Sequence, residues 1–266
     1  MMEFKNFLII ASKKDFAGIN ITTQLSQCKQ KFNFYLTEKD IVDDSGLDYE
    51  KLEKFDFVIF ASKHQSKEKT KTLSVHAPGN WREAMFGGKP EKVCPSSAQF
   101  LKQSFQKLKQ NAEKYNLKNY KITLECTHHG PLIDKPCMFI EIGSTETEWK
   151  DRKAGFVIAK TIEQIINEFK SNNYNENAIA IGGPHYCPNF NKIQGNSNFA
   201  ISHIIPQYAL PLKKEMIEQA ISKTTEEIDL VILDWKGLGN SEQRRQVVKI
   251  LEEFYIRFEK TTNIKK

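Results

Sequence analysis

Short apolar runs that alternate with polar loops and helical segments constrain the fold of this chain most strongly. The runs are rich in β-branched and aromatic residues, which is typical of β-strands. Strands are predicted at residues 6–11, 56–61, 72–75, 121–126, 137–142, 178–181, 200–205 and 229–233. Apolar residues at helical spacing predict helices at residues 96–115, 151–170, 212–222 and 241–258, and an earlier one through Leu25 and Cys28. This alternation predicts an α/β protein with mixed or largely parallel sheets flanked by helices.

The length of 266 residues suits one large domain or two smaller domains that share a core. We expect an N-terminal α/β unit over residues 1–95 and a C-terminal α/β unit over residues 96–266, with most of a shared hydrolytic site in the second. The fractions of hydrophobic (39%) and aromatic (11%) residues argue against a disordered chain. The first apolar run, at residues 7–11, is far shorter than a signal-peptide core or a membrane span, so we expect a soluble, cytoplasmic protein.

Residues 125–149 hold the densest group of chemically active side chains. His128 and His129 follow one predicted strand, and Glu141 lies inside the apolar run of the next. A carboxylate in such a run is costly to bury unless a cation, a metal ion or several donors meet it. A lone buried histidine is usually a hydrogen-bonded core residue, but two adjacent histidines and a buried glutamate favour a hydrolytic or metal site. The spacing matches none of the common zinc signatures.

The five cysteines form no CxxC pair and are odd in number, so a disulfide framework is not expected. Cys126 and Cys187 each lie two residues from a motif histidine. Either could be a metal ligand, a nucleophile or a small apolar neighbour of the site.

Polar loops follow the predicted strands, and ligands of open α/β sheets bind beyond the carboxyl ends of the strands. In one such loop Lys63, Lys67 and Lys69 either contact phosphate or belong to a solvated turn. In another, Gly182 and Gly183 allow a ligand to approach the backbone closely. The net charge of +6 permits a polyanionic partner without requiring one.

A set of motifs occurs in order along nearly the whole chain. They are SKKDFAGINI (12–21), VHAPGN (75–80), THHGP (127–131), FIEIGSTETEW (139–149), GGPHYCP (182–188), SHIIPQY (202–208) and DWKG (234–237). In this set the chain resembles the archaeal and plant type of D-aminoacyl-tRNA deacylase. The resemblance implies a hydrolase that cleaves the ester between a D-amino acid and the terminal ribose of tRNA. It also implies bound Zn²⁺ and a fold similar to two closely associated three-layer α/β units.

An aminoacyl ester is already reactive, so such an enzyme mainly positions a water molecule, deprotonates it and stabilises an oxyanion. The expected zinc ligands are His128, Glu141 and His185, which come from three different strand ends. The expected catalytic residues are His129, Glu146 and Glu141, as general base or as groups that orient a ligand. Adjacent residues of an extended segment point to opposite sides, so His128 and His129 share a role only if the chain bends sharply between them.

The remaining expectations concern the substrate. His64 and His76 are reserves for a second metal ion. The expected substrate-binding residues are His76, Gly182, Gly183, Asp234 and Lys236, and the expected tRNA-binding residues are Lys63, Lys67 and Lys69. The expected partner is tRNA charged with a D-amino acid, and the protein is expected to be a monomer that does not associate with membranes.

A pocket that excludes an L side chain by steric contact cannot exclude achiral glycine, so glycyl-tRNA is an expected side substrate. Two other classes of function use similar residues. A zinc-dependent peptidase or amidohydrolase acting on small acylated molecules would not need Lys63, Lys67 or Lys236. A non-catalytic RNA-binding protein is the other alternative, although the sequence has no RNA-recognition, KH or helix-turn-helix signature.

Overall fold

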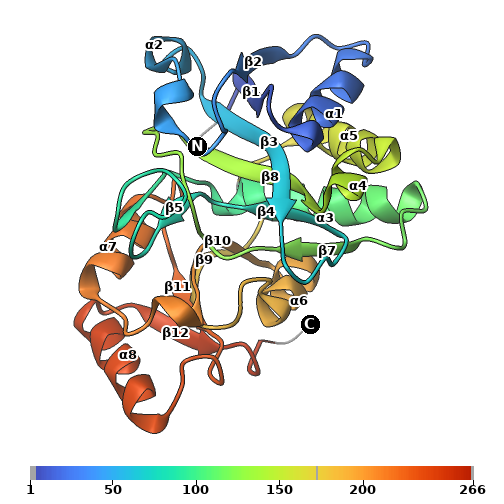
Figure 1. Cartoon of the computed structure of the whole chain (residues 1–266). Helices are drawn as coiled ribbons and strands as arrows, with labels where there is room; N and C mark the ends of the chain where they lie inside the picture. Colours follow the sequence, from blue (N-terminus) through green and yellow to red (C-terminus); the bar gives the residue numbers. More distant parts are fainter. Residues whose placement is uncertain (1–3, 172, 265–266) are drawn as a thin grey trace.

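The computed structural model describes residues 4–171 and 173–264, and within them two large β-sheets are surrounded by helices (Figure 1). The strand order of the first sheet is β2-β1-β3-β8-β4-β7, that of the second is β10-β9-β11-β12, and β5 pairs with β6. The strands are β1 (Phe7–Ser12), β2 (Asn33–Thr37), β3 (Phe57–Gln65), β4 (Thr72–His76), β5 (Gly79–Asn80), β6 (Lys92–Val93), β7 (Lys121–Leu124), β8 (Cys137–Ser144), β9 (Glu176–Ile181), β10 (Phe199–Ile205), β11 (Leu230–Leu233) and β12 (Arg257–Lys260). The helices are α1 (Phe16–Ser26), α2 (Tyr49–Leu52), α3 (Ala98–Lys114), α4 (Glu146–Trp149), α5 (Arg152–Glu168), α6 (Pro188–Asn196), α7 (Lys214–Ser222) and α8 (Ser241–Glu253), with short 3₁₀ turns η1 (Asp44–Gly46) and η2 (Gln207–Ala209). The prediction of an α/β protein is confirmed.

The first sheet is mixed. Strands β2, β1, β3 and β8 run parallel, whereas β4 pairs antiparallel with β8 and parallel with β7. One face packs against α1, α3 and α5, and Ile9, Ile59 and Ile140 on this face are fully buried in the main hydrophobic core. Because side chains alternate between the two faces of a strand, the residues between these lie on the opposite face.

Along that opposite face the sheet changes from apolar to polar. Phe60 and Phe139 stack there with ring centroids 4.6 Å apart, in a second core that loop residues complete. Two residues beyond these phenylalanines lie Ser62 of β3 and Glu141 of β8, which pair with each other. On its other side Glu141 pairs with Ser74 of β4. Strand register therefore places a buried carboxylate on the face opposite α1, α3 and α5.

The second sheet is parallel throughout, and α3 joins it to the first. Helix α3 contacts β4 and β7 of the first sheet as well as β9 and β10 of the second. Helix α6 packs on the same side, whereas Met216 of α7 and Leu251 of α8 form a separate core with Ile179 and Val231 on the other face of the sheet. The second sheet is thus a layer between two layers of helices (Figure 1).

The connections of the second sheet leave its central strands in opposite directions. From β9 the chain passes through α6 to β10 on one side, and from β11 it passes through α8 to β12 on the other side. Neighbouring strands whose connections diverge in this way form a topological switch point, where α/β proteins commonly bind ligands. Here that point lies at the carboxyl ends of β9 and β11.

Most predicted strands and helices match observed elements to within a few residues, but the predicted helix over residues 241–258 is wrong at its end. Helix α8 stops at Glu253, and Arg257–Lys260 forms β12 beside β11. Tyr255 has a φ of +52°, a left-handed conformation that ends a helix. The spacing of Phe254 and Phe258 mimics a helical repeat, and the pairing with β11 overrides it. Strand β2 and helix α6 were not predicted.

The predicted division at residue 95 does not coincide with the division between the sheets. Strands β7 and β8 lie beyond residue 95 but pair with β3 and β4 in the first sheet. The long-range pairing of these strands sets the sheet, and a local composition pattern does not report it. Within the described residues, no helix is both long and apolar enough to cross a membrane.

Candidate metal centre

A cluster of imidazoles and carboxylates, here called the histidine cluster, lies on the polar part of the first sheet's face opposite α1, α3 and α5. It consists of His64 from β3, His76 from β4, Glu125 directly after β7, His128 and His129 from the loop that follows, Glu141 from β8 and His185 from the loop after β9. His64 and His76 lie two residues beyond Ser62 and Ser74, so strand alternation places them on the same face as Glu141. The second sheet contributes His185 from the carboxyl end of one of its central strands.

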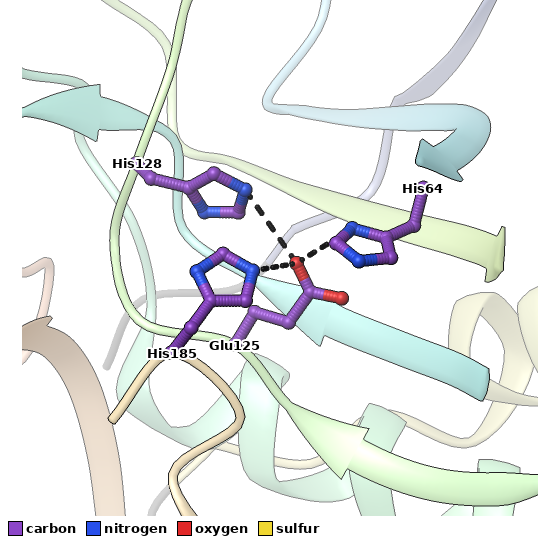
Figure 2. Close-up of side chains that lie close together, drawn as sticks. All are labelled: His64, Glu125, His128 and His185. Atoms are coloured by element: carbon purple, nitrogen blue, oxygen red, sulfur yellow. Dashed lines mark hydrogen bonds and ion pairs between the residues drawn. The ribbon is translucent and has the colours of Figure 1, made fainter. Parts of the chain in front are cut away.

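Three imidazoles converge on one oxygen of Glu125, as Figure 2 shows. Glu125 Oε2 lies 3.0 Å from His185 Nε2, 3.2 Å from His64 Nδ1 and 3.5 Å from His128 Nε2. Glu125 is only 1% exposed, and its Oε1 has no hydrogen-bond partner within the described part of the chain. Burial alone would raise the pKa of this carboxyl, but the hydrogen bonds from His185 and His64 and the charge of His64 lower it well below its usual range.

Backbone carbonyls fix the orientation of three imidazoles. The Nδ1 atoms of His128, His129 and His76 hydrogen-bond to the carbonyl oxygens of Cys126 (2.8 Å), Gly130 (2.7 Å) and Ala77 (3.2 Å). A carbonyl oxygen only accepts, so each Nδ1 carries a proton and donates it. Burial, followed by the nearby His76, lowers the pKa of His128 well below its usual range and that of His129 to about 4, so both rings are neutral at pH 7. Their Nε2 atoms therefore offer a lone pair.

Glu141 repeats this arrangement beside the first carboxylate. Its Oε1 accepts a hydrogen bond of 2.5 Å from Ser62 Oγ, and its Oε2 lies 3.5 Å from His76 Nε2 and 3.8 Å from His64 Nδ1. Glu141 Oε2 and His76 Nε2 are buried without a hydrogen-bond partner among the described residues. Burial raises the pKa of Glu141, but His76 more than offsets it and the pKa is lowered. Because His76 Nδ1 donates its proton to Ala77, a neutral His76 would turn an acceptor towards the acceptor Glu141 Oε2, which a second proton on His76 or a cation between the two atoms relieves.

The donor set fits a metal ion. One ligand atom from each of His64, Glu125, His128 and His185 lies within 4.8 Å of the others, and so do groups formed by His76 with His128 and His129 and by His76 with Glu125 and Glu141. Tetrahedral zinc with bonds of about 2.0–2.1 Å separates neighbouring ligand atoms by about 3.3 Å. The three distances from Glu125 Oε2 to the imidazoles, 3.0 to 3.5 Å, bracket that value. Nδ1–H bonds to carbonyls are also the usual support of metal-binding histidines.

The chain bends sharply at His129, which has a φ of +44°. As a result both adjacent imidazoles enter the cluster, with the His129 ring centroid 4.3 Å from that of His128 and 4.9 Å from that of His76. The left-handed conformation is uncommon for a residue with a side chain. The sharp bend that His128 and His129 need in order to share a role is therefore present.

Further hydrogen bonds hold His64 and His185 in place. His64 Nε2 lies 2.9 Å from Tyr186 Oη, and His185 Nδ1 lies 3.5 Å from Cys126 Sγ. Burial lowers the pKa of His185, but the bonds to Cys126 and Glu125 raise it overall to about 10. A proton on His185 is what a metal ion would have to displace. Cys126 is buried and also lies 2.9 Å from Tyr208 Oη, so it contacts the site from behind His185.

The structure brings together most, but not all, of the predicted metal and catalytic residues. His128 and His185 meet at Glu125 rather than at Glu141, which instead faces His76. Glu146 lies in the first turn of α4, is exposed and forms an ion pair with Lys150. None of the ligand groups found among the described residues includes Glu146.

Of the predicted substrate-binding residues, His76 lies in the cluster and the others lie outside it. Lys63 points to the helix-covered face, with its Nζ 5.2 Å from the ring centroid of Trp149, while Lys67 and Lys69 are exposed in the loop after β3. Asp234 and Lys236 line a separate pocket of about 370 Å³ at the end of the second sheet. Gly182 and Gly183 pack against Asp234 at that end. Glu125 was missed, since its only local signal is that it follows a short strand.

The fold and the cluster define the class: an α/β enzyme whose buried imidazoles and carboxylates suit hydrolytic chemistry. The family model for D-aminoacyl-tRNA deacylase matches residues 51–259, and the chain belongs to this family. It is 36% identical to the D-aminoacyl-tRNA deacylase of Methanocaldococcus jannaschii over 91% of this chain and 94% of that protein. It is 34% identical to that of Thermococcus onnurineus, over 94% of this chain and 98% of that protein.

A solved structure agrees with these sequence matches. The crystal structure of a conserved protein of unknown function, AF0625, is similar to this chain with a TM-score of 0.87 and 30% identity, over 97% of this chain and 96% of that one. The family model and these relatives confirm the family and the enzyme class that the motifs predicted, and the solved structure confirms the fold.

Proposed function

We propose that this protein hydrolyses the ester of D-aminoacyl-tRNA at the histidine cluster and so returns mischarged tRNA to use. In the reaction the oxygen of water bonds to the ester carbonyl carbon, the bond from that carbon to the ribose oxygen breaks, and the ribose oxygen leaves with a proton. The observation that carries the proposal is the convergence of His64, His128 and His185 on one buried oxygen of Glu125. Membership of the D-aminoacyl-tRNA deacylase family supplies the substrate.

The proposed cofactor is Zn²⁺, held by His64, Glu125, His128 and His185. Imidazole nitrogen and carboxylate oxygen are common zinc ligands, and bound zinc acidifies water and polarises an ester carbonyl. The buried Oε1 of Glu125, which has no protein partner among the described residues, supports this choice. His76 and Glu141 are the proposed ligands of a second ion, with Glu125 completing the group.

His129 is the proposed general base. Its Nδ1 proton is held by the carbonyl of Gly130, so Nε2 is free to take a proton from the attacking water. It is less buried than His76, which is 1% exposed, and so lies nearer to an entering substrate. Glu146, exposed and paired with Lys150, is the weaker of the two predicted bases, and Glu141 is proposed to act as a ligand of the second ion beside His76.

The proposed specificity rests on chirality. Steric exclusion of an L side chain leaves D-aminoacyl esters as substrates and cannot reject glycine, so glycyl-tRNA is the proposed side substrate. Lys67 and Lys69 are exposed in the loop after β3 and are proposed to contact tRNA phosphate. The Lys63 side chain lies on the helix-covered face beside Trp149, so it is not part of this proposed contact. We further propose that the protein acts as a monomer in the cytoplasm.

Loss of zinc and activity in two single variants tests the proposal. His128→Ala and His185→Ala should each lose bound zinc and most hydrolysis of D-tyrosyl-tRNA, with circular dichroism nearly unchanged. His203→Gln is the matched control, because His203 is a buried histidine outside the ligand groups found among the described residues, and its Nδ1 lies 3.2 Å from Thr127 Oγ1. Zinc content by mass spectrometry and single-turnover rates are measured on the same preparations. Full zinc retention in both Ala variants would contradict the ligand assignment.

The alternative functions give different results with the wild-type protein. A peptidase or amidohydrolase would cleave a small N-acylated D-amino acid at least as efficiently as D-tyrosyl-tRNA. A non-catalytic RNA-binding protein would bind the charged tRNA and leave the ester intact.

A further inference from the structure

The pocket of about 370 Å³ lies at the switch point of the second sheet. Its walls come from Asp234 and Trp235 after β11, Thr262 after β12, and Asn189 and Lys192 of α6, which follows β9. Carboxyl ends of three neighbouring strands therefore meet around one hollow. The histidine cluster does not use any of these residues.

Close packing joins this pocket to the histidine cluster. Gly182 and Gly183 have φ values of +98° and +80°. A Cβ atom on Gly182 would lie 2.9 Å from the carbonyl oxygen of Asp234, and one on Gly183 would lie 3.1 Å from Asp234 Oδ2. Two residues further along the same loop is His185, so at most roughly 7 Å of chain separates the backbone of Gly183, which packs on Asp234, from that of a cluster residue.

The chemistry of the pocket is mixed. At its base Asp234 is only 5% exposed, and Oδ2 accepts a hydrogen bond of 3.0 Å from Asn189 Nδ2. Trp235 forms an aromatic wall, and Lys260 Nζ lies 3.9 Å from the centroid of its ring. Lys192 and Lys236 are exposed at the rim. These three features match the parts of a nucleotide. The buried acceptor suits a ribose hydroxyl, the aromatic wall suits the nucleobase, and the cations at the rim suit the phosphate.

We propose that this pocket binds a nucleotide of the single-stranded acceptor end of tRNA, beside the ester that is hydrolysed in the histidine cluster. Lys192 and Lys236 contact phosphate, which gives the salt-dependent part of binding. The base packs on Trp235 in place of the Lys260 ammonium, since aromatic side chains are the usual platform for unpaired bases. Asp234 accepts a hydrogen bond from a ribose hydroxyl, as carboxylates do at the switch points of nucleotide-binding α/β sheets. The inference rests on the proposed function, because it assigns a different part of the same substrate.

Neutralising the two rim lysines tests this site. Lys192→Gln with Lys236→Gln is compared with Lys109→Gln with Lys118→Gln, two exposed lysines of α3 and the loop after it that do not line the pocket. Binding of an uncharged, 5′-phosphorylated CCA trinucleotide is measured by calorimetry at several salt concentrations, with 5′-AMP as a second probe. The Michaelis constant and kcat are measured with D-tyrosyl-tRNA.

The pocket variant should bind the trinucleotide on the order of 10-fold more weakly, and the slope of log K against log salt should shrink by about 1.4, roughly 0.7 for each lysine. KM for D-tyrosyl-tRNA should rise with kcat nearly unchanged, because the contact forms before the chemical step. The control variant should behave like the wild type in all three measurements. Asp234→Asn should also weaken the trinucleotide without changing the salt slope, since it alters no phosphate contact.

Equal weakening in the pocket and control variants would overturn the inference, because it would show general attraction between charges. Binding of 5′-AMP as tight as that of the trinucleotide would also overturn it and would indicate a site for free nucleotides. A wild-type protein that binds the trinucleotide but leaves D-tyrosyl-tRNA intact would contradict the proposed function and keep the site. A wild-type protein that hydrolyses D-tyrosyl-tRNA but does not bind the trinucleotide would do the reverse.

Discussion

Replacing Glu125 by Gln removes one negative charge from the centre of the histidine cluster and keeps the shape of the side chain. The carboxylate is 1% exposed, and its Oε2 faces imidazole nitrogens of three histidines at 3.0 to 3.5 Å. An amide can still accept a hydrogen bond from His185 or donate one to His128, so the fold should persist. The variant loses the charge that faces His64 and His185 and that would balance a metal ion.

The expected loss of metal affinity is about 10- to 100-fold, or about 1.4–2.7 kcal/mol, if Glu125 only orients the ligands, and more if it is a ligand itself. Hydrolysis of D-tyrosyl-tRNA should fall by at least the same factor. The effect on stability should be smaller. A charge-assisted hydrogen bond contributes about 1.5–3 kcal/mol, and relief from burying a charge offsets part of that, so Tm should fall by no more than about 6 °C.

Glu148→Gln is the matched control for this experiment. Glu148 is 5% exposed, bonds to Thr145 in the capping box of α4 and lies 3.2 Å from Lys71 Nζ, but it belongs to none of the ligand groups found among the described residues. Zinc content, melting temperature and single-turnover deacylation are measured for both variants. If Glu125→Gln melts earlier yet keeps its zinc and the parental rate, Glu125 is only an ion-pair partner of His185 and His64, and the proposed centre is wrong.

Further predictions concern tRNA contact, substrate chirality and a buried lysine. Lys67→Gln with Lys69→Gln should raise KM for D-tyrosyl-tRNA and flatten its salt dependence, whereas Lys109→Gln with Lys118→Gln should do neither; an unchanged salt slope in the first pair would contradict phosphate contact. The wild type should hydrolyse glycyl-tRNA and leave L-tyrosyl-tRNA intact in the same assay, and equal rates on the two would exclude a steric chiral filter. Lys102 is fully buried, its Nζ donates to three backbone carbonyls at 2.7–2.8 Å, and burial lowers its pKa to about 7. Its unfolded pKa is about 10.4, so between pH 7 and 10 the unfolded chain binds more protons and stability rises with pH. Urea unfolding should therefore show the wild type gaining up to about 1.4 kcal/mol per pH unit relative to Lys102→Met, which should be less stable at every pH because three carbonyls lose their donor; parallel pH profiles would refute the linkage.

The sequence predicted those site residues that carry a local signal and missed those that depend on strand pairing. His128 and His185 stand beside Gly and Pro after apolar runs, and both enter the cluster. Glu125 follows a short strand like many surface residues, and only the register between β4 and β7, in which Val75 pairs with Leu124, places it next to His76. That register joins residues about fifty positions apart, and neither composition nor periodicity reports it.

His64 illustrates the same limit of sequence-based prediction, because the end of its strand was predicted too early. The predicted strand at residues 56–61 stops before a polar segment that looks like a loop, but β3 continues to Gln65 because β8 pairs with it as far as Ser144. The extension turns a loop histidine into a strand residue on the same face as Ser62. Pairing, not local preference, therefore decides that His64 joins the proposed metal centre rather than a possible second one.

The position of the histidine cluster links the two sheets. His64 and Glu125 belong to the first sheet, whereas His185 belongs to a loop of the second, and its imidazole lies 3.0 Å from the Glu125 carboxylate. A metal ion held by all three would join the sheets directly, in addition to the shared helix α3. Binding free energy of such an ion is then also free energy of association between the sheets. Neither sheet holds the complete donor set by itself, so a cut at residue 95 would separate His64 from the other ligands, and a cut anywhere between Glu125 and His185 would divide the carboxylate from the second sheet's imidazole.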